Sequence, residues 1–180
     1  MSLYFITSSK HKFEEIQSII AHIRHIDIDL PEIQDSNPQN IIRNKLQEAR
    51  KHHDGQLMVE DTSLYFDCLN GLPGPLIKWF LKSIGRDGLC HIAQSFKNTK
   101  ATAKTIIGYA QSKDEIHFFE GEIQGHIVNP RGNQGFGWDA IFEPEGESKT
   151  FAEMNMKEKN ELSMRKLAAE KLKQFLNNDA

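Results

Sequence analysis

Apolar and polar positions follow two different periods along the start of the chain. The apolar run Leu3–Ile6 predicts a short buried strand, and the helix-capping residues Thr7-Ser8-Ser9 come directly after it. Apolar residues then recur at helical spacing from Phe13 to Ile23, which predicts an amphipathic helix. Ile26–Leu30 alternates apolar and acidic residues, as a half-exposed strand does, and Pro31 ends it.

The next stretch predicts helices on either side of one buried strand. Residues 42–49 carry a second amphipathic pattern, and residues 57–59 form an apolar strand that ends abruptly at Glu60-Asp61-Thr62. A proline opens and a glycine closes a third helix over residues 75–85. A short helix is expected over residues 89–96.

The second half of the chain changes to strands and closes on a helix. The loop Asn129–Asp139 contains three glycines, and Asn160–Asn177 predicts a long amphipathic helix. Because no repeat or linker interrupts it, the pattern predicts an α/β fold with a mixed sheet, as a single domain over residues 1–180. The expected strands cover residues 105–110, 116–119 and 122–128.

Composition narrows the class of protein. The 180 residues are 38% hydrophobic and 26% charged, which is typical of a globular protein with a sizeable core. The net charge of -3 provides no global positive field for a nucleic-acid backbone. Cys68 and Cys90 form no CxxC pair, which argues against a disulfide scaffold and a zinc ribbon. Since no apolar run suits a membrane span or a signal peptide, we expect a cytoplasmic protein that binds neither membranes nor nucleic acid.

The first candidate for chemistry is the junction between the first strand and the first helix. The first amides of a helix lack internal partners and carry partial positive charge, so they attract anions. Hydroxyls and lysines at this point predict a phosphate cradle, although they also fit a plain helix cap followed by solvated lysines. The candidate phosphate-binding residues here are Thr7, Ser8, Ser9, Lys10, His11 and Lys12.

Three carboxylates form the second candidate, a magnesium site made of Glu32, Glu60 and Asp61. Mg²⁺ takes oxygen ligands and bridges carboxylates to substrate phosphates. Neighbouring residues of a regular strand point to opposite faces, so both acids reach one ion only if the strand already turns at Glu60. Otherwise one of them acts on the metal and the other behind it. A solvated strand end is the alternative interpretation.

An aromatic loop and a charged helix start are the remaining candidates. Glycines on both sides of Phe136 leave room for a flat ligand to stack on its ring, and Asp139 can accept from a purine N–H. The run Lys157–Arg165 places cations near a helix start, where they are unfavourable without an anionic or acceptor partner. A turn with two core aromatics and a solvated helix face are the alternatives. P-loop, GxGxxG, GxSxG and HExxH signatures are missing from the sequence.

Taken in order, these stretches resemble the inosine triphosphate pyrophosphatase family, and most closely its eukaryotic-type members. Each motif is weak alone, but the ordered set is specific and extends from Thr7 to Arg165. The segments that carry the resemblance are Val59-Glu60-Asp61-Thr62, Gly71-Leu72-Pro73-Gly74-Pro75-Leu76-Ile77-Lys78-Trp79-Phe80 and Phe136-Gly137-Trp138-Asp139.

The resemblance implies an elongated α/β protein in which a long central mixed β-sheet and its flanking helices form two lobes around a nucleotide cleft. It implies a homodimer and Mg²⁺ as the cofactor. It also implies hydrolysis of the non-standard purine nucleotides ITP, dITP and XTP to the monophosphate and pyrophosphate, which cleanses the nucleotide pool.

By position, the resemblance also assigns site residues. Asp61 falls on the catalytic acid position, and Glu32 and Glu60 fall on magnesium-associated positions. The phosphate motif includes Thr7, Ser9, Lys12 and a contacting lysine, Lys45. The base pocket includes Phe136, Gly137, Trp138, Asp139, Lys159, Ser163, Met164 and Arg165.

Two residues depart from the family pattern. Ser9 stands where the family usually has Asn, and Met164 stands where it has the His of Ser-His-Arg. We expect Arg165 to aim a donor at the 6-oxo group of inosine or xanthosine, where adenine presents an amino donor. The missing imidazole predicts modestly relaxed selectivity, by about 1 kcal/mol.

Two other classes of function are considered. A nucleotide-binding regulatory protein would keep the same residues without turnover, but the three carboxylates favour an enzyme. A structure-specific nucleic-acid binder would use the aromatic loop and the lysines, but the acidic net charge disfavours it.

Overall fold

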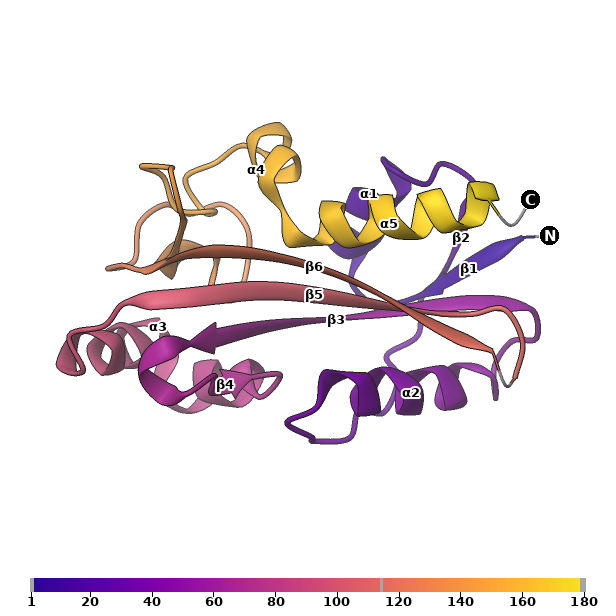
Figure 1. Ribbon diagram of the computed structural model, residues 1–180, viewed down its shortest axis with the longest axis horizontal. Coiled ribbons are helices and arrows are strands. Elements are labelled where there is room, and N and C mark those ends of the chain that lie inside the picture. Colours follow the sequence, from indigo (N-terminus) through magenta and orange to yellow (C-terminus); the bar gives the residue numbers. More distant parts are fainter. Residues whose placement is uncertain (1, 114, 179–180) are drawn as a thin grey trace. The chain divides into compact units, whose positions relative to one another are not determined.

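The computed structural model describes residues 2–113 and 115–178 (Figure 1). The chain divides into two compact units. Unit 1 comprises residues 1–62, 105–121 and 164–180, and unit 2 comprises residues 63–104 and 122–163. The seven strands of the described residues form one mixed sheet, which confirms the predicted α/β class. A single independently folding domain stays a prediction. The strands that contribute to both units are β3 (Gln56–Phe66), β5 (Lys100–Ala110) and β6 (Ile116–Ile127).

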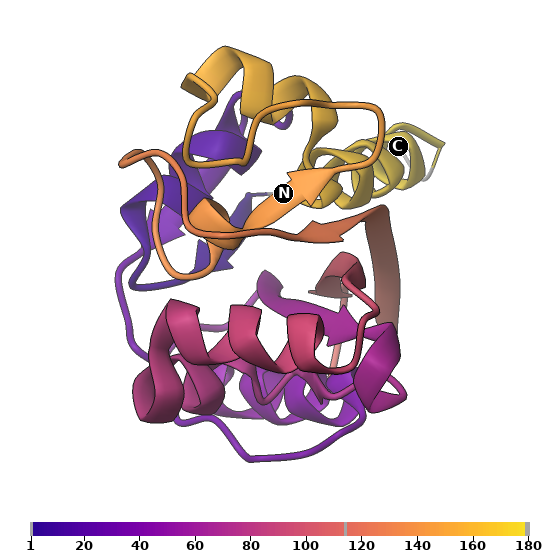
Figure 2. The same cartoon turned by 90° about the vertical axis from the view of Figure 1, so that its left-hand side faces the viewer.

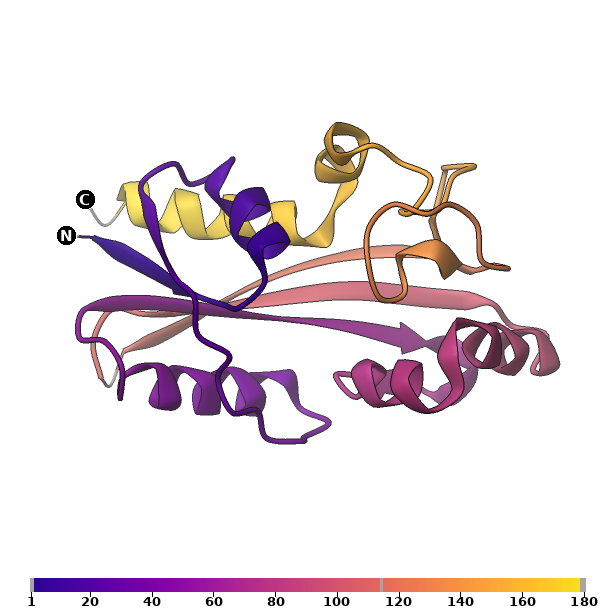
Figure 3. The same cartoon turned by 180° about the vertical axis from the view of Figure 1, so that it is seen from behind.

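Unit 1 is built on parallel pairing at one edge of the sheet. The first strand pairs in parallel with the second and the third, so that Leu3 lies opposite both Ile23 and Gln56. Helices α1 and α5 cover one face of these strands and α2 covers the other (Figures 1 and 3). The remaining elements of this unit are β1 (Leu3–Ile6), α1 (Lys10–Gln17), β2 (Ile23–Ile26), α2 (Pro38–Ala49) and α5 (Met164–Asn178).

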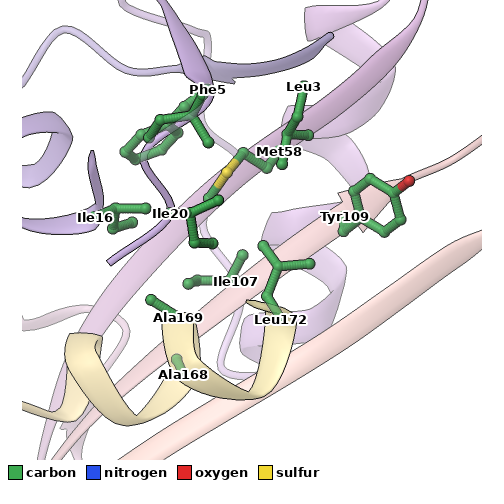
Figure 4. Packing of buried hydrophobic residues seen from close by; sticks show 11 residues of the cluster. Leu3, Phe5, Ile16, Ile20, Met58, Ile107, Tyr109, Ala168, Ala169 and Leu172 are labelled. Atoms are coloured by element: carbon green, nitrogen blue, oxygen red, sulfur yellow. The ribbon is translucent and has the colours of Figure 1, made fainter. Parts of the chain in front are cut away.

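The core beneath α5 joins that helix to three strands. Ala168 and Leu172 of the helix face apolar side chains of β1, β3 and β5 (Figure 4). Fully burying one large apolar side chain contributes about 1.5–3 kcal/mol, so this cluster is a main source of the stability of unit 1. Its buried members are Leu3, Phe5, Ile16, Ile20, Ile23, Met58, Ile107, Tyr109, Ala168, Ala169 and Leu172.

Gly121 fixes where α5 begins. A Cβ atom at this position would lie 2.0 Å from the carbonyl oxygen of Met164 and 2.7 Å from the backbone nitrogen of Ala168. Strand β6 and the first turn of α5 therefore touch backbone to backbone, which only glycine permits. This contact sets the position of Arg165, the second residue of the helix.

Unit 2 carries α3 on one side of its strands and α4 on the other (Figure 2). Its short fourth strand runs antiparallel to β3, and its seventh runs antiparallel to β6. Besides its part of the long strands, its elements are η1 (Asp67–Leu69), β4 (Pro73–Gly74), α3 (Ile77–Ser95), η2 (Asp139–Ile141), β7 (Phe142–Pro144) and α4 (Met156–Leu162).

The helix α3 is broken at Gly85, where we predicted that a helix would end. Gly85 has φ 68° and ψ −174°, a backbone conformation in which L side chains are strained. The second helical segment resumes directly after this residue rather than at Leu89. Within residues 2–113 and 115–178, no helix combines the length and the apolar character that crossing a membrane requires.

Several predicted boundaries near the start of the chain were wrong. The first helix ends at Gln17 rather than at Ile23, and the second strand is Ile23–Ile26 rather than Ile26–Leu30. The four residues of β1 pair with four residues of β2. The length of the partner strand therefore sets the bounds of β2, and the local alternation of apolar and acidic residues does not. The third strand runs on to Phe66 instead of ending before Glu60, because it also pairs with β4 beyond that point.

Two later boundaries were also wrong. The strands predicted over residues 116–119 and 122–128 form one strand, β6, that continues through Glu120 and Gly121. The predicted tail helix is two helices separated at Ser163, whose φ of −68° and ψ of 141° are extended. Hydrophobic periodicity shows which residues share a face, but not whether one residue in a helical pattern leaves the helix.

Candidate active site

The segment Thr7–Ser9 between β1 and α1, here called the phosphate loop, is held by hydrogen bonds to its own hydroxyl groups. The Ser9 side chain caps α1 by accepting from the Lys12 backbone N–H (3.4 Å), and the Thr7 Oγ1 accepts from the Ser9 N–H (3.1 Å). The predicted helix cap is therefore confirmed. Two members of the predicted cradle, Lys10 and His11, are exposed, and Lys10 pairs with Glu14.

A cavity of about 120 Å³ opens beside this loop. It brings the loop together with two lysines and two of the three predicted carboxylates. Such a pocket offers hydroxyl and ammonium donors next to carboxylate oxygens, which suits an anion that arrives with a hard cation. Its lining residues are Ile6, Thr7, Ser8, Ser9, Lys12, Ile28, Asp29, Leu30, Glu32, Lys45, Val59 and Glu60.

Glu60 and Asp61 point to opposite faces of β3 because the strand stays regular through both residues. Glu60 meets Lys12 and Arg165, whereas Asp61 meets Lys45. The expectation that the strand ends at Glu60 was wrong. The two acids therefore belong to separate charge clusters, which is the second of the two arrangements that the sequence left open.

The Glu60 cluster is a buried network of charges. Arg165 Nε donates to Glu60 Oε2 (3.1 Å), and Thr62 Oγ1 donates to the same oxygen (3.1 Å). Lys12 Nζ contacts Glu60 Oε1, and Arg165 Nη1 contacts Glu15 Oε2. Burial would raise the pKa of Glu60, but the Lys12 ammonium and the Arg165 guanidinium outweigh it and lower that pKa to about 2.

Glu15 was missed by sequence reasoning. It follows Glu14 in a helical run that reads as a solvated face, yet its carboxylate is buried beside Arg165. Glu15 is 8% exposed and lies between the apolar positions Phe13 and Ile16. The burial of this charge is explained by its partner on α5. The helical period places Glu15 near the buried face, and that was the available signal.

The Asp61 cluster is centred on Lys45. The Lys45 Nζ lies 3.2 Å from Asp61 Oδ1 and 3.1 Å from Glu32 Oε2, and it donates to the Glu60 carbonyl oxygen (3.1 Å). Burial would lower the pKa of Lys45, but the carboxylates of Asp61 and Glu32 outweigh it and raise that pKa. Burial also raises the pKa of Asp61 despite its contact with Lys45. The structure thus joins the predicted phosphate lysine to two predicted metal ligands.

The three predicted magnesium carboxylates do not gather around one point in the described residues. Within residues 2–113 and 115–178, no three His, Cys, Asp or Glu side chains gather as a metal site. Glu32 and Asp61 both direct oxygens at one cation, the Lys45 ammonium, and Mg²⁺ usually takes one or two carboxylates in addition to substrate phosphates. Glu60 Oε1 faces Lys12, and its Oε2 accepts from Arg165 and Thr62, so the predicted role of Glu60 as a ligand stays a prediction.

The aromatic loop of unit 2 is shaped by Asp139. Its Oδ2 accepts from the Phe136 N–H (2.9 Å) and from Lys159 Nζ (2.7 Å). A Cβ atom on Gly135, whose φ is 74°, would lie 2.1 Å from the same oxygen. Asp139 is buried, so it folds the loop rather than presenting this oxygen to a purine N–H as we predicted. Phe136 is 44% exposed, and Lys159 Nζ lies 5.5 Å from its ring centroid.

Trp138 belongs to the core of unit 2 and not to a ligand surface. It is 7% exposed and packs edge-to-face on Phe142, with ring centroids 5.5 Å apart. The predicted base-binding role is therefore not supported for this side chain. The loop has a further support that sequence reasoning missed: Arg86 Nε donates to the Gly137 carbonyl oxygen (2.7 Å). Arg86 directly follows the break at Gly85 in α3, and only the fold brings it to the loop.

The last predicted base-pocket residues are buried. Ser163, Met164 and Arg165 are 0%, 3% and 3% exposed. Arg165 was expected to aim a donor at the base, but its Nε, Nη1 and Nη2 bind Glu60, Glu15 and Thr62. A guanidinium buried without carboxylate partners would be strongly unfavourable, which explains why it is committed to them.

Comparisons with known proteins show the family and agree with the fold. A model of the Ham1 family matches residues 3–175. The chain is 42% identical over 182 residues to the inosine triphosphate pyrophosphatase of Schizosaccharomyces pombe, with 99% of this chain and 96% of that protein covered. It is equally identical over 183 residues to the enzyme of that name from Giardia intestinalis, covering 99% and 94%. The solved structure of a HAM1 protein from Coxiella burnetii is similar in fold, with a TM-score of 0.87, 22% identity and 99% coverage of each chain.

Proposed function

This chain belongs to the Ham1 family, and from that premise we propose that it is a pyrophosphatase that hydrolyses ITP, dITP and XTP to the monophosphate and pyrophosphate. The curated relatives that it resembles over nearly its whole length are inosine triphosphate pyrophosphatases. Removal of these nucleotides cleanses the purine pool. The cluster of Lys45 with Glu32 and Asp61 is the observation that carries the proposal, because the predicted phosphate lysine and two predicted metal ligands pair there.

The triphosphate binds to unit 1 in this proposal. Lys12 and Lys45 line the cavity and offset phosphate charge, and the amides that open α1 at Ser9 add partial positive charge. Glu32 and Asp61 are the residues that would hold Mg²⁺. When bound, this ion supplies charge neutralisation and a lowered pKa for an attacking water. Glu60, which also lines the cavity, keeps Lys12 and Arg165 in place.

Asp61 is the proposed proton acceptor for the attacking water. It is an almost buried carboxylate that shares Lys45 with Glu32, and both Lys45 and Glu32 line the cavity. A carboxylate in such a position can accept a proton in the transition state, and the same oxygen can serve a metal ion. Magnesium titration of an Asp61 variant separates the two roles, as described below.

The base binds to unit 2 in this proposal. Phe136 offers an exposed ring, and stacking of a base on an aromatic side chain contributes about 1–3 kcal/mol. With Arg165 committed to its carboxylates, Lys159 is the cationic donor beside that ring. A donor there is matched by the 6-oxo group of inosine or xanthosine and mismatched by the 6-amino group of adenine.

A panel of nucleoside triphosphates tests the proposal directly. We expect ITP, dITP or XTP to yield monophosphate and pyrophosphate with Mg²⁺ present, and ATP and GTP to be much poorer. Orthophosphate as the first product, or full turnover in excess EDTA, would refute it. Tight nucleotide binding without any pyrophosphate release would instead identify the regulatory protein.

A homodimer and a cytoplasmic location complete the proposal, the first on the resemblance to the family. Light scattering during gel filtration measures the mass against the 20.6 kDa of one chain. Subcellular fractionation tests the location. A salt titration with DNA and RNA checks that no nucleic acid binds.

A further inference from the structure

We propose that His25 is a positioning residue that holds the phosphate loop of unit 1 through the Thr7 carbonyl group. The inference rests on the proposed function, because it concerns how the same loop receives a triphosphate. His25 lies on β2, outside the cavity lining and outside every motif that the sequence brought forward. Its ring nitrogen Nε2 is 2.8 Å from the Thr7 carbonyl oxygen, 18 residues away along the chain.

The direction of this hydrogen bond is fixed by its partner. A carbonyl oxygen only accepts, so His25 Nε2 must carry a hydrogen. The Thr7 N–H in turn donates to the Ile26 carbonyl oxygen (3.1 Å). Two neighbouring residues of β2 therefore hold the N–H and the C=O of Thr7, the first residue of the loop.

The His25 ring also contacts the helix that follows the loop. It stacks on Phe13 of α1, with centroids 4.3 Å apart and an interplanar angle of 13°. The Phe13 N–H donates to the Ser9 carbonyl oxygen (3.1 Å), which is the first hydrogen bond of the helix. One imidazole thus joins the start of the loop to the first turn of α1, so it sets the direction in which the opening amides of that helix point.

Loss of this donor acts on substrate binding more than on chemistry. Thr7 Oγ1 accepts from the Ser9 N–H, so a change in the orientation of Thr7 passes to the capping residue of α1. Asp61 and Lys45 are held by β3 and α2, which His25 does not touch through any of the contacts described. Weaker binding with a preserved chemical step raises KM and leaves kcat nearly unchanged.

Matched substitutions at position 25 isolate the hydrogen bond. His25→Phe keeps a flat ring against Phe13 and removes the donor, whereas His25→Gln keeps a donor and removes the ring. The control is His22→Ala, three residues earlier on the exposed segment before β2. We expect KM for ITP to rise about fivefold in His25→Phe, the effect of one neutral hydrogen bond, with kcat within about twofold. His25→Gln and His22→Ala should both stay closer to the wild type.

Two readouts without turnover separate this inference from the proposed function. Calorimetry with inorganic triphosphate and Mg²⁺ should show the same fivefold loss for His25→Phe, whether or not any nucleotide is hydrolysed. Long-range ¹H–¹⁵N spectra of the wild type, recorded where the imidazole is neutral, should show the tautomer protonated at Nε2. The Nδ1-protonated tautomer would overturn the proposal, and so would unchanged KM and unchanged triphosphate affinity in a folded His25→Phe variant. A third outcome is a wild type that hydrolyses no nucleotide but has the Nε2-protonated tautomer, together with a His25→Phe variant that loses triphosphate affinity. This outcome would refute the proposed reaction and leave His25 in its role.

Discussion

The cavity of unit 1 and the aromatic loop of unit 2 differ in how they hold the groups that we propose to contact a ligand. In unit 1 the functional groups are charged, nearly buried and already paired with one another, as Lys45 is with Glu32 and Asp61. In unit 2 the proposed contact group is the exposed ring of Phe136, and the buried Asp139 beneath it folds the loop by accepting from the Phe136 N–H. The difference teaches that a site for phosphates and a hard cation is organised by electrostatics, whereas a stacking site is organised by backbone shape.

The paired charges of unit 1 also make that unit sensitive to substitution. Removing one partner of a buried ion pair leaves an uncompensated charge. This lowers the free energy of unfolding by more than an exposed ion pair contributes to it. An exposed aromatic ring can be removed without leaving a cavity. We therefore expect substitutions of these buried charges to affect turnover or folding strongly, and substitution of the exposed Phe136 ring to affect base affinity alone.

The largest effect is expected at Asp61. In Asp61→Asn the amide accepts a proton poorly and binds Mg²⁺ weakly, so kcat should fall by about 10²–10⁴-fold. The fold should survive, because Lys45 keeps its contact with Glu32. Steady-state kinetics at several Mg²⁺ concentrations check both points, with the exposed Asp54→Asn as control. A low kcat at an unchanged magnesium requirement identifies the proton acceptor, and a shifted requirement identifies a metal ligand. Normal turnover with an unchanged requirement would remove Asp61 from the mechanism.

Arg165 tests whether the charge network of unit 1 is needed for folding. Arg165→Met removes the buried guanidinium that pairs with both Glu15 and Glu60, so the free energy of unfolding should fall by about 3 kcal/mol. Urea denaturation in EDTA measures this. The control Lys166→Met, one residue later and part of a loose surface pair, should change it by less than about 0.5 kcal/mol. Equal stability of the two variants would mean that the network contributes little.

Phe136 tests the other half of the comparison. Phe136→Ala removes the stacking surface, worth about 1–3 kcal/mol, so KM for ITP should rise by about tenfold or more. Affinity for inorganic triphosphate should not change, because that ligand has no base. The control Phe96→Ala removes another exposed ring of unit 2, which is 61% exposed at the end of α3. An equal loss for both ligands would show that the loop contributes to more than base binding.

Sequence reasoning succeeded where a residue acts through its type and its place on an element. The strand-to-helix junction at Ser9, the break at Gly85 and the α/β class were all predicted from the sequence. The ordered motif set also predicted the family that the comparisons show. In each of these cases the signal is local: a cap, a turn residue, a period or a short motif.

Sequence reasoning failed where the decisive partner is far along the chain. The resemblance placed Arg165 in the base pocket. No local feature of the sequence reveals that Glu15, 150 residues earlier, binds its guanidinium. Likewise, the apolar run before Glu60 gives no sign that β3 continues beyond that residue and pairs there with β4. Long-range pairing decides which polar groups are satisfied, and periodicity carries no information on that.

The smallest expected effect concerns Met164, between Ser163 and Arg165. It is 3% exposed and opens α5, where the family pattern has an imidazole. The thioether fills a comparable volume but accepts hydrogen bonds only weakly, so one side-chain hydrogen bond of the family is missing here.

Met164→His should restore that bond, at about 1 kcal/mol, and raise the ratio of kcat/KM for ITP over ATP by about fivefold. The direction follows from the resemblance, which implies a base pocket with an imidazole at this position. The N–H of an imidazole is matched by the 6-oxo group of ITP and mismatched by the 6-amino group of ATP. Met164→Leu is the matched control, since it keeps the packing and adds no hydrogen-bonding group, and its ratio should equal that of the wild type. If the histidine variant is folded and its ratio is also unchanged, residue 164 only packs, and selectivity must then come from unit 2, where Lys159 beside Phe136 is the first residue to replace.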